Sequence, residues 1–158
     1  MPNWTYNTIT VTEGTCDLRK FISEHNDFDF NLIIPEPKSK EQCIVDYGEE
    51  YIDKGDSHLM HDETDKWFNW YSWHCNFWGT KWNACHVCMA DDGSSVDFDT
   101  AWAAPEPIFK RLSEMYPTCI FTTESEYEDG GYWACEWRNG KKYGECYEEG
   151  YEDEDEVR

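Results

Sequence analysis

The sequence predicts an α+β fold in which helices pack on one face of an antiparallel β-sheet. Residues 4–11 alternate between two faces and are rich in β-branched side chains, as in a half-buried strand. Asn139-Gly140, between two short strand-like runs, is a strong hairpin signal. The order of predicted elements is strand, helix, strand, strand, helix, strand and a terminal hairpin, which favours two helices on one face of one sheet.

The first helix is predicted at residues 16–25, where Leu18, Phe21 and Ile22 form an apolar stripe. It follows the strand at 4–11 directly. A strand followed by a helix therefore opens the domain.

An irregular segment at residues 27–63 follows this helix. Pro35 and Pro37 disfavour a helix there and indicate an extended insertion that lies over the core. A second helix is predicted at 64–75, where apolar residues occur almost all the way round, and Gly79 ends it.

The second half of the chain is predicted to hold the remaining strands and one helix. The predicted strands are 82–90, 95–102, 118–127, 132–137 and 141–147. The helix spans 105–115, with prolines in its first turn. Together these elements predict one ferredoxin-like split βαβ domain at 1–147, with an extra C-terminal hairpin. The acidic residues 148–158 are predicted to form a disordered tail.

Charge narrows the classes of partner. The formal net charge is −21 over 158 residues, so the chain repels phosphate groups and is a poor direct partner for nucleic acid or an anionic membrane. A basic protein surface is the partner that this charge favours. The sequence gives no indication of oligomeric state.

The cellular setting is predicted from the N-terminus and the cysteines. The N-terminus has neither a basic region nor an apolar region of an export signal, and no apolar run is long enough for a bilayer span. Eight cysteines are then expected to be reduced thiols in a soluble cytoplasmic protein.

An aromatic stretch between Trp70 and Ala84 points to a candidate site. In a split βαβ sheet, the starts of the first and second strands and the end of the third share one edge. Residues expected to form a ligand or partner patch there are Asn3, Trp4, Trp78, Lys81, Trp82, Asn83, Thr100 and Trp102. The Trp rings could stack on a planar ligand, with Lys81 as the charge. The alternative is an aromatic corner in which these rings cover the sheet end and the Asn side chains fix turns.

Metal and nucleophile motifs are weak. Cys85 and Cys88 resemble a zinc knuckle, but on a regular strand they face opposite sides. His58 and His61, completed by His74 or Cys75, are the other weak candidates for metal ligands. We expect no bound metal, no cofactor and no catalytic residue, because neighbouring His and Cys on a helix or strand point apart.

The acidic residues near the C-terminus form a second candidate surface. The residues expected to contact a partner are Glu124, Glu126, Glu128, Asp129, Glu145, Glu148 and Glu149. Alternate residues of a strand share a face, so Glu124, Glu126 and Glu128 are expected to form a row of charges. The alternative is a solvated face that keeps the protein soluble.

Several stretches resemble a known family. The matching stretches are Met1-Pro2-Asn3-Trp4 with Asn7, Asp29-Phe30-Asn31, Ile33-Ile34-Pro35 with Pro37, Trp70-Tyr71 with Trp73, Trp78 to Ala84, and Phe98 with Thr100-Ala101-Trp102. They resemble the YubB ferredoxin-like domain family of phage- and plasmid-encoded proteins. The resemblance spans residues 1 to 117. It implies the ferredoxin-like fold and a mobile-element origin, but no reaction.

These observations lead to two functional hypotheses. The first is a non-enzymatic cytoplasmic phage or plasmid protein that binds a host defence complex of CRISPR or restriction type. Its acidic surface would inhibit or modulate that complex, with nucleic-acid mimicry as the mechanism. The alternative is a small-ligand or nucleotide-binding protein, a sponge, that uses the Trp/Asn/Lys patch.

Overall fold

The computed structural model describes residues 3–25, 27–53 and 67–150. In this part of the chain six strands form one sheet: β1 (Trp4–Glu13), β2 (Cys85–Met89), β3 (Ser95–Ala101), β4 (Ile120–Tyr127), β5 (Tyr132–Arg138) and β6 (Lys141–Glu148). The order across the sheet is β2-β3-β1-β4-β5-β6, and every pairing is antiparallel. The first four strands in that order have the split βαβ arrangement, and β5 and β6 add the C-terminal hairpin. The predicted fold class is confirmed.

Within residues 3–25, 27–53 and 67–150, three helices and three 3₁₀ turns accompany the sheet. They are η1 (Leu18–Phe21), η2 (Phe30–Leu32), α1 (Lys40–Tyr47), η3 (Glu49–Tyr51), α2 (Trp70–Phe77) and α3 (Glu106–Met115). No helix among the described residues is long and apolar enough to cross a membrane.

One face of the sheet carries the core. Phe109 of α3 packs against Trp133 and Trp137 of β5, with ring centroids 6.2 Å apart in both pairs. Over β3, Phe28 stacks on Phe98 at 5.1 Å and Phe30 contacts the same ring at 5.7 Å. The core side is thus covered by α3 and by the aromatic residues between η1 and η2, and the other side of the sheet stays open.

The prediction of a helix at residues 16–25 is wrong. Only the four residues of η1 are helical, and Ile22 then forms an isolated bridge with Phe28. The Asp17 side chain accepts a hydrogen bond from the backbone N–H of Arg19, while the N–H of Leu18 donates to the carbonyl of Gly93. The helical turn ends because the chain then folds back on itself: the N–H of Ser23 donates to the carbonyl of Asp27, and the N–H of Asp29 donates to the carbonyl of Phe21. One turn is enough to bury both Leu18 and Phe21.

The prediction that the insertion holds no helix is also wrong, because α1 lies in it. A proline restricts its own backbone and the residue before it, so a helix can begin soon after Pro37. Ser39 caps α1 by accepting a hydrogen bond from the N–H of Gln42 at 3.1 Å. Gly48 ends the helix at a φ of 98°, a conformation that glycine adopts without strain.

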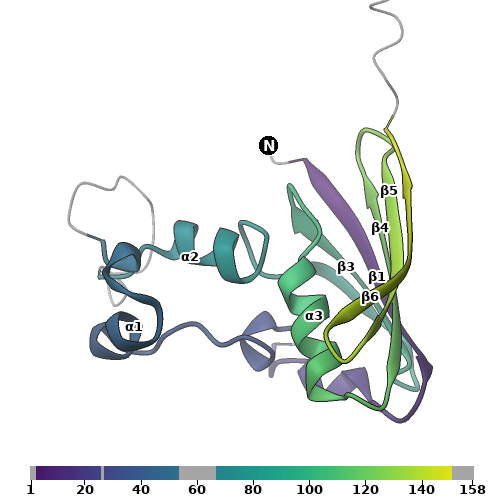
Figure 1. The fold of residues 1–158 in the computed structure, drawn as a ribbon, viewed down its shortest axis with the longest axis horizontal. Helices are drawn as coiled ribbons and strands as arrows, with labels where there is room; N and C mark the ends of the chain where they lie inside the picture. Colours follow the sequence, from purple (N-terminus) through teal and green to yellow (C-terminus); the bar gives the residue numbers. More distant parts are fainter. Residues whose placement is uncertain (1–2, 26, 54–66, 151–158) are drawn as a thin grey trace, which may run out of the picture.

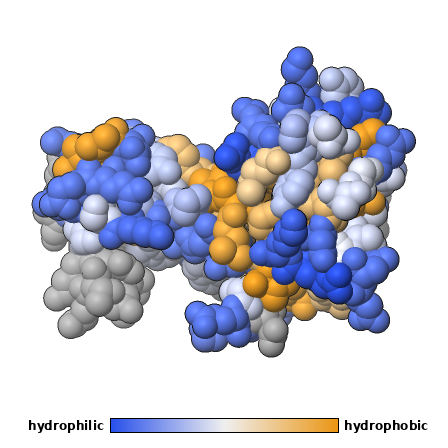
Figure 2. Space-filling view, turned by 90° about the horizontal axis from the view of Figure 1, so that it is seen from below, coloured by the Kyte–Doolittle hydropathy of each residue, from blue (hydrophilic) through white to orange (hydrophobic). Residues whose placement is uncertain are grey.

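The second predicted helix is confirmed in part. It begins at Trp70 because the Asn69 side chain caps it by accepting from the N–H of Ser72, and it runs two residues past the predicted end. Residues 64–66 lie outside the described part of the chain. Figure 1 shows α1 and α2 set apart from the sheet on a lateral extension. Figure 2, seen from below, shows hydrophilic residues over most of both parts and a hydrophobic band at their junction.

Asn7 ties the three central strands together in the core. Its side-chain amide donates to the Thr100 hydroxyl of β3 at 2.9 Å, and its oxygen accepts from the Ser125 hydroxyl of β4 at 2.7 Å. Asn7 is only 2% exposed, so these bonds form away from water. A buried polar group that loses its partner costs free energy, and this network therefore helps to fix the register of β1.

Replacing Asn7 with alanine tests this role. Asn7→Ala leaves the Ser125 hydroxyl without its acceptor and is expected to lower the free energy of unfolding by about 2–4 kcal/mol. Urea unfolding measures the change. Thr10→Ala, on the open side of the same strand, should cost less than about 1 kcal/mol. Equal losses in the two variants would contradict a special role for Asn7.

Candidate functional site

Three separate parts of the chain meet at one end of the sheet. The rings of Trp4 and Trp82 have centroids 6.3 Å apart. The Lys81 ammonium lies 4.7 Å from the Trp82 ring centroid and 4.9 Å from that of Trp102. We call these four residues the aromatic rim. The structure thus brings together the start of β1, the segment before β2 and the end of β3, as the topology predicts.

Trp102 owes its position to an unusual backbone conformation. Its φ is 75°, a value that is rare for a bulky residue, and its side chain is 45% exposed. Its N–H donates to the carbonyl of Asn3 at 2.8 Å, and the Thr80 hydroxyl donates to the carbonyl of the preceding Ala101 at 2.6 Å. These two bonds hold the chain where it leaves β3 and keep the Trp102 ring at the surface.

Trp78 is not part of the rim. It is 1% exposed and belongs to the core, where its ring stacks on His74 with centroids 4.1 Å apart. Its indole N–H donates to the carbonyl of Ile34 at 2.9 Å. Its position in the sequence beside Gly79 suggested the patch, but its burial makes it a structural residue.

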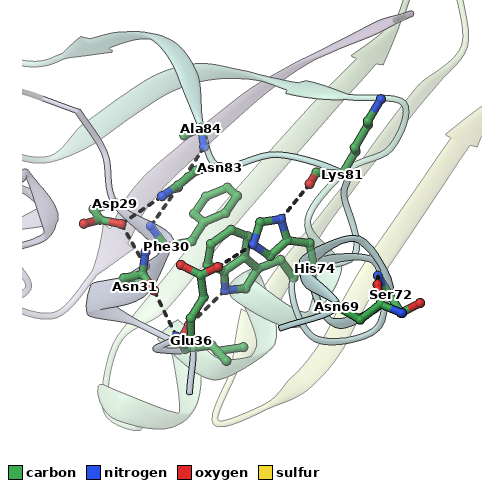
Figure 3. Close-up of polar contacts among 12 residues, drawn as sticks. Asp29, Phe30, Asn31, Glu36, Asn69, Ser72, His74, Lys81, Asn83 and Ala84 are labelled. Atoms are coloured by element: carbon green, nitrogen blue, oxygen red, sulfur yellow. Dashed lines mark hydrogen bonds and ion pairs between the residues drawn. The ribbon is translucent and has the colours of Figure 1, made fainter. Parts of the chain in front are cut away.

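Asn83 and Thr100 lie near the rim, but their polar groups are already in use. The Asn83 oxygen accepts from the N–H groups of Phe30 and Ala84, and its amide donates to Asp29, all within 2.9 Å (Figure 3). The fully buried Thr100 hydroxyl donates to the carbonyl of Ala103 at 2.6 Å. For these two residues the geometry matches the alternative of an aromatic corner.

Replacing Asn83 tests that structural role. Asn83→Ala removes two hydrogen bonds that hold η2 and its cap against the segment before β2, and one within that segment, and should lower the free energy of unfolding by about 2 kcal/mol. The measurement is urea unfolding. Asn3→Ala, at an exposed position, should cost less than about 0.5 kcal/mol. An Asn83→Ala protein as stable as Asn3→Ala would show that this amide is free for a ligand.

The described residues hold no group of three His, Cys, Asp or Glu side chains that could bind a metal ion. His58 and His61 lie outside the described part of the chain. His74 uses both ring nitrogens: Nδ1 lies 2.8 Å from the Lys81 carbonyl and Nε2 lies 2.7 Å from the Glu36 carboxylate (Figure 3). Cys75 is a free thiol whose pKa is raised, chiefly by burial.

The expectation that Cys85 and Cys88 face opposite sides does not hold. β2 carries a bulge between them, where His86 has a φ of 53°. Because of the extra residue, Cys85 pairs with Asp99 and Cys88 with Asp97, two positions on one face of β3. Strict alternation cannot be applied across a bulge, and the sequence gives no signal for one here.

The open face of the sheet has a hollow of about 410 Å³. We call it the acidic hollow. It is lined by Tyr6, Asn7 and Thr8 of β1, His86 of β2, Asp97, Phe98 and Asp99 of β3, Glu124 and Glu126 of β4, and Tyr132 of β5. Four carboxylates thus flank β1, two on each side. The lining of the acidic hollow contains no Lys or Arg.

Neutral or titratable side chains provide the hydrogen bonds to these carboxylates. The Thr8 hydroxyl donates to Asp97 at 2.7 Å, and the Tyr132 hydroxyl donates to Glu124 at 3.0 Å. His86 Nδ1 lies 2.7 Å from Asp99. Burial raises the pKa of Tyr132 to about 12, with the Glu124 carboxylate adding to the shift. Tyr132 therefore remains a neutral donor at physiological pH.

Glu128 continues the acidic surface beyond the end of β4. The pKa of Tyr6 is raised by burial, by the charges of Glu128 and Asp99, and by a hydrogen bond to Glu128. The position of Glu128 beside Tyr6 places it at the margin of the hollow. Glu124, Glu126 and Glu128 thus follow one another along the open face, although Glu128 lies in the turn after the strand.

The other acidic candidates are not part of the row formed by Glu124, Glu126 and Glu128. Glu145 lies on the core side, where it accepts from the Trp133 indole at 2.7 Å and contacts Lys142 at 3.4 Å. Asp129 accepts from the N–H of Gly131 within its turn at 2.8 Å. Glu148 is paired with Tyr132 at the far edge of the open face, and Glu149 is exposed beyond the strand.

Sequence reasoning missed Asp97 and Asp99. Both lie in a predicted strand, and their alternation with Val96 and Phe98 was a usable signal that they share its polar face. That they lie beside Glu124 and Glu126 follows only from the strand order, because β1 pairs with both β3 and β4.

Comparison with known families gives one match. Residues 77–158 match the model of the ferredoxin-like domain in Api92-like protein, which is more than half of the chain. The chain belongs to this family. No curated protein and no solved structure gave a match. The matched part of this Api92-like ferredoxin-like domain includes Lys81, Trp82, Trp102 and all four carboxylates of the acidic hollow, whereas β1 precedes it.

Proposed function

We propose that the protein binds a basic surface of another protein through the acidic hollow, and that it acts by binding and not by catalysis. The observation that carries this proposal is the set of four carboxylates, Asp97, Asp99, Glu124 and Glu126, around a hollow with no Lys or Arg in its lining. A concave surface of one charge focuses the electrostatic field and attracts groups of the opposite charge.

The hollow differs from the acidic residues that the fold already neutralises. Elsewhere in the described chain, Asp17 pairs with Arg19 at 2.8 Å and Glu106 pairs with Lys142 at 2.8 Å. No Lys or Arg among the described residues forms an ion pair with a carboxylate of the hollow. Lysine and arginine side chains of a partner would supply the missing positive charge.

The arrangement of the charges supports nucleic-acid mimicry as the mode of binding. Two carboxylates on β3 and two on β4 form parallel rows on either side of β1. Neighbouring members of a row are about 6.6–6.8 Å apart, and the rows are about 10 Å apart across two strand spacings. Two such rows present negative charge at regular intervals, as nucleic-acid strands do.

The partner class that we propose is a host defence complex of CRISPR or restriction type, whose basic groove normally holds nucleic acid. We also propose that the protein comes from a phage or plasmid and acts in the host cytoplasm. The resemblance to the YubB family supports this origin and, with it, the choice of a host defence complex as partner. Binding in such a groove would inhibit or modulate the complex because the acidic hollow would compete with nucleic acid for the same basic side chains.

The alternative, a small-ligand or nucleotide-binding patch, is less well supported. Of its expected polar groups, Asn83 and Thr100 are held in hydrogen bonds within the fold. The Lys81 ammonium remains as the cation, but it lies against two Trp rings of its own chain. Carboxylates nearby would repel a phosphate group.

A labelled oligo-arginine peptide provides a defined basic probe for the acidic hollow. Neutralising the hollow with Asp97→Asn, Asp99→Asn, Glu124→Gln and Glu126→Gln should weaken peptide binding by roughly tenfold or more, because several exposed ion pairs are lost together. Fluorescence anisotropy measures the dissociation constant. Raising the salt from about 50 to about 200 mM should also weaken binding to the unmodified protein.

The matched control removes the same number of carboxylates elsewhere. Glu24→Gln, Glu41→Gln, Glu49→Gln and Glu50→Gln change exposed residues outside the sheet and give the same net charge as the hollow variant. This control should stay within about twofold of the unmodified protein, since screening limits the reach of distant surface charges. Equal weakening in the two variants would mean that overall charge, and not the hollow, binds the peptide.

Lys81 distinguishes the two proposals because they require opposite effects of its charge. The Trp4 ring lies 5.2 Å from that of His86, which lines the hollow, so the rim adjoins the hollow. Lys81→Gln removes a positive charge from this margin and should tighten oligo-arginine binding by about twofold. Lys110→Gln, an exposed residue of α3, is the charge-matched control and should have a smaller effect.

If Lys81→Gln instead abolished a thermal shift produced by a nucleotide panel and left peptide binding unchanged, the nucleotide-binding alternative would replace the proposal. A ligand present at about 100 times its dissociation constant stabilises the folded state by about 2.7 kcal/mol, which a thermal shift detects.

A further inference from the structure

A second and smaller cavity lies at the same end of the sheet as the aromatic rim. Its volume is about 110 Å³. It is lined by Asn3, Trp4, Trp102, Tyr127, Glu128 and Asp129, with Thr5 completing the wall. We call it the rim cavity. It is well below the roughly 300–1,000 Å³ of pockets that hold drug-sized ligands, so it suits the head group of a side chain and excludes a nucleotide.

The lining of the rim cavity has the chemistry of a cation site. Trp4, Trp102 and Tyr127 provide aromatic rings, and Glu128 and Asp129 provide two carboxylates. Ring faces attract cations through their quadrupole, and a carboxylate accepts charge-assisted hydrogen bonds. No Lys or Arg is among these lining residues, so the positive charge would have to come from a bound group.

The Trp102 ring already attracts an ammonium group within the protein. Lys81 Nζ lies 4.9 Å from its centroid, at a distance typical of a cation–π contact. Lys81 does not line the rim cavity. The contact shows that this ring can hold a cation, and Lys81 itself is not a wall of the cavity.

Thr5 places a buried and unpaired hydroxyl in the wall of the rim cavity. Thr5 is 1% exposed, lines the rim cavity, and its hydroxyl has no hydrogen-bond partner in the described structure. A buried hydroxyl without a partner is costly, and most such groups in proteins are satisfied. The hydroxyl oxygen is itself buried, so a donor bound in the cavity would reach it only after a small shift of the wall.

The rim cavity is continuous with the acidic surface. Glu128 lines the cavity and lies close enough to Tyr6, which lines the acidic hollow, to raise the pKa of its hydroxyl. Trp4 and Tyr6 lie two residues apart on the same face of β1. A basic partner that covers the hollow would therefore also reach the cavity.

We propose that the rim cavity anchors one arginine side chain of the basic partner, between the Trp4 and Trp102 rings and against Glu128 and Asp129. The proposal rests on the proposed function for the source of the arginine. Arginine suits the site better than lysine because a planar guanidinium stacks on aromatic rings and can donate two parallel hydrogen bonds to one carboxylate. One arginine buried in the rim cavity would fix the position of the partner, which the charges of the acidic hollow alone would hold less specifically.

The test uses the full chain and capped arginine, N-acetyl-arginine N-methylamide, observed through the indole N–H signals of the tryptophans in an NMR titration. The signals of Trp4 and Trp102, assigned with Trp→Phe variants, should shift and saturate. Capped citrulline has nearly the same shape without the charge and should produce no saturable shift. Capped lysine should bind more weakly than capped arginine.

The double variant Glu128→Gln and Asp129→Asn should raise the dissociation constant of capped arginine roughly tenfold, because charge-assisted hydrogen bonds are lost. Asparagine can still accept the N–H of Gly131, so the turn is preserved. The charge-matched control, Glu124→Gln with Glu126→Gln, lies in the hollow and should change the dissociation constant by less than about twofold. Equal weakening, tighter binding of capped lysine, or no saturable shift with arginine would overturn the anchor.

The citrulline comparison needs no carboxylate variant, so it decides the matter even if a double variant fails to fold. Failure of the anchor is also distinguishable from failure of the proposed function. If neutralising the hollow weakens oligo-arginine while capped arginine does not bind the cavity, the anchor is wrong and the proposed function stands. If capped arginine binds the cavity but the hollow variant binds oligo-arginine normally, the hollow is not the docking surface.

Discussion

The two-residue repeat of β1 is the constraint on which the rest of the structure depends. Thr5, Asn7 and Ile9 face the core, whereas Trp4 and Tyr6 face the open side, because successive residues of a strand point to opposite faces. β1 lies between β3 and β4, so its inward residues set the centre of the core and its outward residues divide the acidic rows. A slip of one residue would bury Tyr6 and expose the Asn7 network, and would lose the core, the acidic hollow and the rim together.

The strands were predictable because their information is local. Alternation in the strands and the Asn139-Gly140 turn placed most of the sheet to within three residues, and the strand order followed from the split βαβ pattern. The helical parts of the insertion were less predictable. The apolar spacing of Leu18 and Phe21 fits one 3₁₀ turn as well as a full helix, and the turn ends because Phe21 and Ile22 bond to the segment at Phe28 and Asp29. α1 buries only Cys43, so it has no apolar stripe to reveal it.

The meeting of Trp4, Trp82 and Trp102 was predictable from topology, but which side chains remained available was not. Asn83 hydrogen-bonds Asp29 and Phe30, partners more than fifty residues earlier in the chain, and nothing in the local sequence distinguishes such an amide from a free one. The acidic hollow could not be predicted from the local sequence for the same reason. Its two rows come from β3 and β4, and they form one surface only because β1 holds both strands in register.

The positions of the few Lys and Arg residues leave the acidic hollow without a positive charge of its own. A chain with 34 acidic and 13 basic residues cannot pair every carboxylate, so the placement of its cations decides where negative charge accumulates. Lys142 is held between Glu106 and Glu145 on the core side, and Lys81 lies against the rim tryptophans. The hollow receives neither. Repulsion among like charges opposes the compact state, so a cluster supported only by hydroxyl and imidazole partners carries a cost that binding of a cation would offset. The fold thus carries, on its open face, a deficit of positive charge that a basic partner is suited to fill.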